Sequence, residues 1–111
     1  MENKINVNDL ARSCNEILVL ALLSKGRLHG YQLALELEKR SGNYFRLTYG
    51  TIYPLMHKLE KQGYIKGEWE VEETQRKRKF YKLTSAGQKH LEKSKMEWLG
   101  FFEHLVAILG G

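Results

Sequence analysis

The spacing of apolar residues divides this chain of 111 residues into five segments. In the first three and the last, apolar side chains recur every three or four positions, which is typical of amphipathic helices. The fourth alternates apolar and polar residues, as a half-buried strand does. The pattern therefore predicts helices over about 9–24, 30–40 and 48–62, a hairpin over about 64–83, and a last helix over 84–111.

Capping residues are expected at the ends of these helices. Asp9 and Thr48 are good N-cap residues for the first and third helices, because their side-chain oxygens can accept a bond from an amide of the first turn. The last helix is expected to start at Thr84 or Ser85, and Ser85 with Gln88 three positions later fits a capping box.

The third helix, within LTYGTIYPLMHKLEKQGYI, has two distinct faces. Its apolar stripe consists of Ile52, Leu55, Met56 and Leu59. The opposite face holds Gly50, Pro54, His57 and Lys61, flanked by Tyr53 and Lys58. Such a face suits approach to phosphates and base edges, whereas the alternative is the solvated side of an ordinary core helix. Capping at Thr51 instead of Thr48 would move Pro54 into the first turn, and Gly63 is a plausible C′ residue.

The segment after Gly63 reads as a two-stranded hairpin. Ile65, Trp69 and Val71 share one face of its first strand, a polar loop follows over 72–77, and Lys79, Tyr81 and Leu83 share a face of the return strand. Three helices followed by a hairpin form the winged helix-turn-helix arrangement. The expected chain is thus mainly α with a small β-hairpin, divided into a winged helix-turn-helix domain over 1–83 and a dimerisation helix over 84–111.

Two helices carry more apolar surface than one small domain is expected to cover. The middle of the first helix, ILVLALL, is apolar on every side, which predicts burial by a second chain unless it is the central helix of a monomer. The last helix spaces its apolar residues as a coiled-coil seam does. The residues predicted at a homodimer interface are Ile17, Leu18, Trp98, Phe102, Leu105 and Leu109.

Composition adds a polyanionic partner to this picture. The formal net charge is +5, which favours nucleic acid over a membrane surface. The run Arg76, Lys77, Arg78 and Lys79 in the hairpin predicts phosphate contacts, with cross-strand pairing to nearby glutamates as the alternative. The single cysteine and the lack of a signal peptide or a long apolar run predict a cytoplasmic protein without a membrane span.

Three stretches together resemble the PadR family of bacterial transcriptional regulators: HGYQLALELEKRSG, LTYGTIYPLMHKLEKQGYI and RKRKFYKLTSAG. The resemblance covers about residues 14–91. It implies a homodimeric repressor bound to a roughly palindromic operator in double-stranded DNA. It also places Tyr31, Tyr49, Gly50, Thr51, Tyr53 and Lys58, with the basic hairpin, at positions used on DNA.

The length and the single C-terminal helix resemble the short, multidrug-sensing branch of that family. In those members a tryptophan of the C-terminal helix lines a drug-binding space at the dimer centre, and Trp98 resembles it. The resemblance implies a planar aromatic effector near Trp98, Phe101 and Phe102, although the two phenylalanines could instead fill that space. A protein with no effector, in which Trp98 belongs to the dimer core, is the alternative.

Other classes of function fit the sequence poorly. The four histidines form no H-x-x-x-H pair, no Gly-rich phosphate loop is visible, and one cysteine does not supply a metal-sensing cluster. We therefore expect no enzyme activity, no cofactor and no metal site. The alternative from another class is a winged-helix module that binds a partner protein, and salt-sensitive binding to duplex DNA would distinguish the two.

Overall fold

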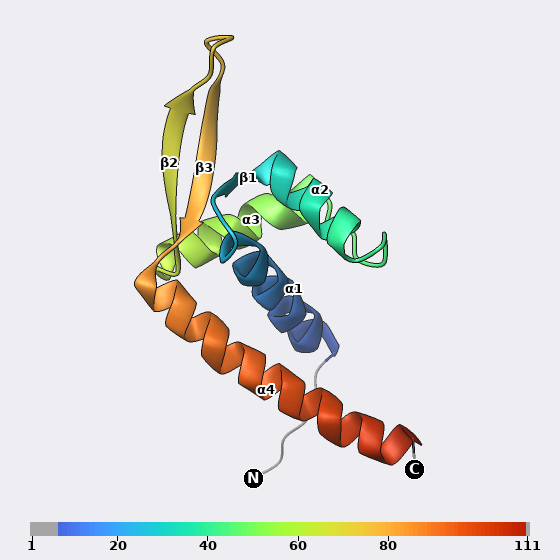
Figure 1. Cartoon of the computed structure of the whole chain (residues 1–111). Coiled ribbons are helices and arrows are strands. Elements are labelled where there is room, and N and C mark those ends of the chain that lie inside the picture. Colours follow the sequence, from blue (N-terminus) through green and yellow to red (C-terminus); the bar gives the residue numbers. More distant parts are fainter. Residues whose placement is uncertain (1–6, 111) are drawn as a thin grey trace.

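The computed structural model describes residues 7–110 and is mainly helical with a small antiparallel sheet, as the sequence predicts (Figure 1). In chain order the elements are α1 (Val7–Leu23), β1 (Leu28–His29), α2 (Gly30–Arg40), α3 (Tyr49–Lys61), β2 (Ile65–Val71), β3 (Lys77–Leu83) and α4 (Ser85–Gly110). The hairpin of β2 and β3 projects from one end of the helical body and α4 from the other (Figure 1). Residues 1–6 and 111 lie outside the described residues.

The first helix departs from two predictions. It begins at Val7, so Asp9 lies inside the helix and is not its N-cap. Its C-terminal half is also covered within the chain: Val19, Leu20, Leu22 and Leu23 are buried against the other elements. The argument that ILVLALL requires a second chain is therefore wrong for these four positions. Ile17 and Leu18 remain half-buried.

The core lies where α1, α2, α3 and the base of the hairpin meet. The third helix contributes Ile52, Met56 and Leu59, all fully buried, which confirms its predicted apolar stripe, and Leu55 packs at the edge. The inward residues of α2 are Leu33, Ala34 and Leu37, and Ile65, Tyr81 and Leu91 complete the core. The face of α3 opposite these residues is left free for another role.

A short strand that the sequence did not reveal extends the hairpin to three strands in the order β1-β3-β2. Leu28 pairs with Tyr81 and His29 with Phe80, so the segment before α2 is attached to the return strand. Within the hairpin, Ile65 pairs with Leu83 and Val71 with Lys77. The start of α2 and the hairpin are consequently fixed to each other by backbone bonds.

The third helix is bounded as the sequence predicts, but its N-cap bond differs. Thr48 occupies the N-cap position without accepting an amide bond, and its hydroxyl instead lies 3.2 Å from the Thr51 hydroxyl. Pro54 falls in the second turn. At the other end Gly63 has φ +82°, and the amide of Tyr64 donates to the Leu59 carbonyl at 3.0 Å, as in a Schellman motif.

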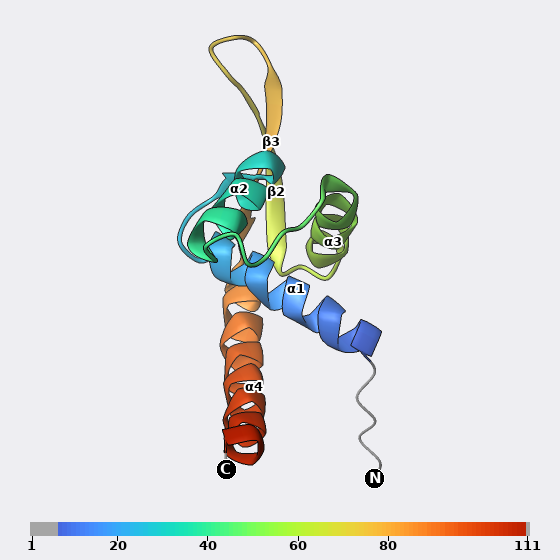
Figure 2. The ribbon, with the colours of Figure 1, turned by 90° about the vertical axis from the view of Figure 1, so that its right-hand side faces the viewer.

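The N-terminus of α4 is capped by Thr84, not by the predicted capping box from Ser85. The Thr84 hydroxyl accepts a bond from the Gly87 amide at 3.0 Å and donates to the Gly63 carbonyl at 2.6 Å. Gly87 packs so closely that a Cβ there would overlap the Tyr64 carbonyl. These contacts fix the start of α4, whereas its second half extends away from the body (Figures 1 and 2).

Candidate nucleic-acid interface

Three tyrosines form an exposed aromatic surface where α2 and α3 begin. The rings of Tyr31 and Tyr49 are stacked at 6.0 Å between centroids, and Tyr53 lies 6.2 Å from Tyr49. The Tyr53 ring packs on Gly30, where a Cβ would lie only 2.9 Å from the ring. About half of each tyrosine side chain is exposed. The N-terminal ends of two helices thus present aromatic rings and phenolic hydroxyls together.

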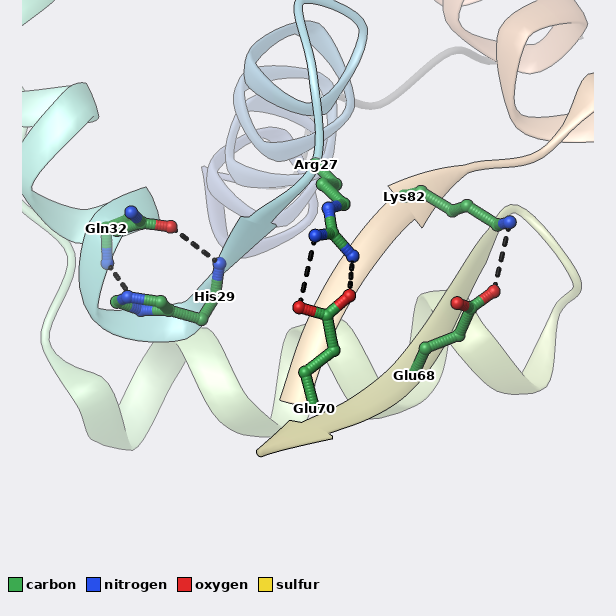
Figure 3. Close-up of polar contacts among 6 residues, drawn as sticks. All are labelled: Arg27, His29, Gln32, Glu68, Glu70 and Lys82. Carbon is green, nitrogen blue, oxygen red and sulfur yellow. Dashed lines mark hydrogen bonds and ion pairs between the residues drawn. The ribbon is translucent and has the colours of Figure 1, made fainter. Parts of the chain in front are cut away.

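His29 fixes the start of α2 and contacts the hairpin. Its Nδ1 accepts a bond from the Gln32 amide at 3.2 Å, and the Gln32 side chain accepts one from the His29 amide, which forms a capping box (Figure 3). Its Nε2 lies 2.8 Å from Nη1 of Arg78. A neutral imidazole has one accepting nitrogen, so the tautomer decides whether Nδ1 accepts from the Gln32 amide or Nε2 accepts from Arg78.

Burial of His29, reinforced by the charge of Arg78, lowers the pKa of this imidazole. Its side chain is only 8% exposed and its ring meets the edge of Phe80 at 5.3 Å. The neutral form is therefore favoured. The sequence reading overlooked His29, although a polar residue directly before GYQL could have been recognised as an N-cap.

The tyrosines and the hairpin enclose a groove of about 670 Å³. It is lined by His29, Gly30, Tyr31, Tyr49, Tyr53, Trp69, Arg76, Lys77, Arg78, Lys79 and Tyr81. Seven of the predicted DNA-binding residues are thereby brought together from α2, α3 and the hairpin. Trp69, which the sequence reading assigned only to a strand face, is 68% exposed beside them.

The four cations of the basic run have different surroundings. Arg76 and Lys77 are exposed, and their side chains form no hydrogen bond or ion pair with the residues that the structure describes. Arg78 pairs with Glu72 at 2.8 Å and Lys79 with Glu60 of α3 at 3.0 Å. Two cations of this run are therefore paired with glutamates, as the alternative predicts, and for the other two phosphate contact stays a prediction.

The remaining predicted residues of α3 lie outside this groove. Gly50, Thr51 and Lys58 border a smaller cavity of about 310 Å³ between α1 and α3. The Lys58 ammonium pairs with Glu16 of α1 at 2.6 Å, although half of the lysine side chain stays exposed. His57 and Lys61 are exposed on the same helix. These five residues are not gathered into one pocket.

The hairpin is braced on its other side by ion pairs that are shown in Figure 3. The Arg27 guanidinium forms two bonds with the Glu70 carboxylate and lies 4.8 Å from the centre of the Phe80 ring. Lys82 and Glu68 pair across the two strands at 3.0 Å (Figure 3). Arg27 was not singled out in the sequence, because its partner is 43 positions away.

A second candidate site lies between α1 and α4. A cavity of about 400 Å³ is lined by Leu10, Ser13, Glu16, His90, Lys93, Ser94, Glu97, Trp98 and Phe101. Trp98 is half-buried there, with its ring 5.8 Å from Phe101 and 5.5 Å from Phe102. The predicted effector residues are therefore neighbours, and Trp98 and Phe101 face the cavity while Phe102 is exposed.

Among residues 7–110, no group of histidine, cysteine or acidic side chains is arranged to hold a metal ion. Within the same range, no helix has the length and apolar character needed to cross a membrane.

The three-helix core, the projecting hairpin and the groove between them define a winged helix-turn-helix protein. Residues 19–93 match the model of the transcriptional regulator PadR-like family. The chain is 31% identical over 81 residues to the negative transcriptional regulator PadR of Bacillus subtilis. That match covers 73% of this chain but only 42% of the other, so the chain spans less than half of that regulator.

Solved structures show the same relationship. A transcriptional regulator from Clostridium thermocellum superposes with a TM-score of 0.79 at 27% identity, over 91% of this chain and 95% of the other. A PadR-like transcriptional regulator from Bacillus cereus gives a TM-score of 0.79 at 27% identity, over 93% and 98%. The chain belongs to the PadR-like family, which consists of transcriptional regulators and not of enzymes.

Proposed function

We propose that this regulator binds operator DNA as a homodimer and represses transcription. The observation that carries the proposal is the groove in which the tyrosines of α2 and α3 lie together with Arg76 and Lys77, two cations that pair with no described residue. Aromatic and hydroxyl groups suit base edges and sugars, whereas free guanidinium and ammonium groups suit phosphates.

The face of α4 that α1 leaves uncovered supports the homodimer. Its exposed apolar residues are Met96, Leu99, Phe102, Leu105, Val106, Ile108 and Leu109. A monomer rarely exposes so continuous an apolar surface, and a two-fold pair of α4 helices would cover it. In such a dimer the two copies of α3, each the recognition helix that would enter the major groove, are expected to lie about 34–36 Å apart, one turn of duplex DNA.

The test is the salt dependence of duplex binding. The duplex is one that the wild-type protein selects from a random pool, because the operator is not known. If Arg76 and Lys77 each neutralise a phosphate, the double alanine variant should reduce the slope of log affinity against log salt by about 1.8. Alanine at Lys89 and Lys95 of α4 makes the same change in net charge and should leave the slope unchanged.

Affinity for duplex that does not vary with salt would contradict DNA binding and favour a winged-helix module that binds a protein. An unchanged slope in the Arg76 and Lys77 variant alone would remove the hairpin loop from the contacts.

The cavity beside Trp98 supports a small-molecule effector as part of the same proposal. Trp98 and Phe101 offer ring surfaces for stacking, which favours a planar aromatic ligand. The carboxylate of Glu97 borders the same space, beside Lys93, and would pair with a cationic ligand, whereas Glu16 is already paired with Lys58. A ligand that binds there would release DNA only if it binds one arrangement of the two winged domains more tightly than the other. Repression would then depend on how α4 sets the separation of those domains.

Tryptophan fluorescence tests the effector proposal. With Trp69→Phe as background, Trp98 is the only tryptophan, and planar aromatic cations should quench its emission in a saturable manner. Trp98→Ala should lose the response of DNA binding to ligand but keep DNA affinity. If Trp98→Ala weakens both DNA binding and the dimer, Trp98 belongs to the dimer core and the regulator has no effector at this position.

A further inference from the structure

One carboxylate joins the recognition helix to both strands of the hairpin. Glu60 lies in the last turn of α3, where its Oε2 accepts a bond from the Gly67 amide of β2 at 3.0 Å. Its Oε1 accepts a bond from the Lys79 ammonium of β3, also at 3.0 Å. The Lys79 ammonium lies 5.2 Å from the centre of the Tyr81 ring, so its chain crosses the hairpin from one strand towards α3.

The chain leaves room for this contact by placing a glycine at position 67. A Cβ on Gly67 would overlap Cε of Lys79 and lie 2.9 Å from Oε2 of Glu60. The Lys79 side chain therefore passes directly over the backbone of Gly67. The bond from Lys79 lowers the pKa of Glu60, and the bond to Glu60 raises the pKa of Lys79, so both groups are charged at neutral pH.

We propose that Glu60 is a positioning residue for DNA binding, which holds the hairpin at a fixed angle to α3, and that Lys79 is its partner and not a phosphate contact. This inference rests on the proposed binding of DNA in the groove. It revises the role expected for Lys79 from the sequence, while Arg76 and Lys77 at the hairpin loop keep theirs.

The distance from this contact to the loop explains why the contact matters. Gly67 is followed by four more residues of β2, which span about 13 Å, so a tilt of about 10° about the contact would move the loop by about 2 Å. A displacement of that size exceeds the range of distances over which a hydrogen bond to phosphate forms. Two-stranded hairpins have little stability alone, so the angle must be held by contacts with the body.

The direction in which Glu60→Gln changes DNA affinity distinguishes a positioning residue from an ordinary surface charge. Removal of an acidic residue beside bound DNA reduces repulsion and should strengthen binding. If Glu60 positions the hairpin, Glu60→Gln should instead weaken binding to the selected duplex, by roughly tenfold. Glu68→Gln is the matched control, because Glu68 pairs with Lys82 inside the hairpin and makes no bond to α3 that the structure describes. It should bind as tightly as wild type or more tightly.

Two further variants test the contact itself. Gly67→Ala alters no charge but displaces Lys79, so it should weaken binding to a similar extent as Glu60→Gln. Lys79→Met should weaken binding without changing the salt slope, whereas loss of a direct phosphate contact would lower the slope by about 0.9. The double variant Glu60→Gln, Lys79→Met should lose little more DNA affinity than either single variant, since both substitutions remove the same contact.

Hydrogen exchange gives a readout that does not depend on DNA. In Glu60→Gln and Lys79→Met, amides of β2 and β3 should exchange faster while those of α2 and α3 keep wild-type protection. Equal or tighter duplex binding by Glu60→Gln, or a reduced salt slope in Lys79→Met, would overturn the inference. Failure of the wild-type protein to select any duplex would overturn the proposed function and this inference with it. If instead the wild type binds duplex and the Glu60 and Lys79 variants behave as Glu68→Gln does, only the positioning role of Glu60 is refuted.

Discussion

Replacement of His29 should reduce the stability of the protein by a predictable amount. His29→Ala removes the side-chain acceptor of the α2 capping box, which is worth about 1 kcal/mol. It also removes an aromatic contact with Phe80, worth about 0.5–1.5 kcal/mol. The expected loss in the free energy of unfolding is therefore about 2 kcal/mol. His29→Asn keeps an acceptor for the Gln32 amide and should recover about half of that loss.

The same residue should make stability depend on pH. Burial, followed by the charge of Arg78, lowers the pKa of His29 in the folded protein below its ordinary value of 6.5. Between the two pKa values the unfolded chain binds more protons than the folded one, so stability falls as pH falls through this window. The contribution is fully present above about pH 6.5. The carboxylate of Glu72 opposes the shift without reversing it.

Urea denaturation of wild type, His29→Ala and His29→Asn measures both the loss of stability and its pH dependence. The protein concentration is kept equal, because the stability of a dimer depends on concentration. Between about pH 7.5 and about pH 5.5, wild type should lose more stability than His29→Asn, which cannot titrate at this position. If the two proteins lose the same amount, His29 titrates as it does in the unfolded chain. The capping bond to Nδ1, which requires an unprotonated nitrogen, would then be refuted.

Two other predictions concern packing at a glycine and an ion pair. Gly87→Ala should lower the free energy of unfolding by about 1–3 kcal/mol or more, because its methyl group would overlap the Tyr64 carbonyl. Gly100→Ala has open space around it and should stabilise α4 by about 0.5–1 kcal/mol. Thermal unfolding measures both changes, and equal effects would contradict the packing at Gly87. Lys58→Ala should lower DNA affinity while sparing the dimer, and Glu16→Gln should raise affinity by freeing Lys58; unchanged affinity in Lys58→Ala would remove that residue from the contacts.

Local sequence signals were sufficient for most elements of the fold. The bounds of α2 follow from its apolar spacing, and those of α3 follow from its apolar spacing together with Thr48 and Gly63 at its two ends. These signals could be recognised in the sequence because they act within a few residues. The alternation after Gly63 predicted the hairpin and which residues share a face. The strand β1 was missed, because two residues carry no period and their pairing partner, β3, is about 50 positions further along the chain.

Residue types in the sequence also predicted the chemistry of the candidate interface: tyrosines at two helix starts and a basic run in the hairpin. Only the tertiary structure decided which of these side chains are free. Lys79 is paired with Glu60 and Arg78 with Glu72, whereas Arg76 and Lys77 are unpaired by any described residue. The physical reason is that an ion pair depends on distance in space, and α3 and the hairpin approach each other only after the core has formed. The burial of α1 within the chain was decided in the same way.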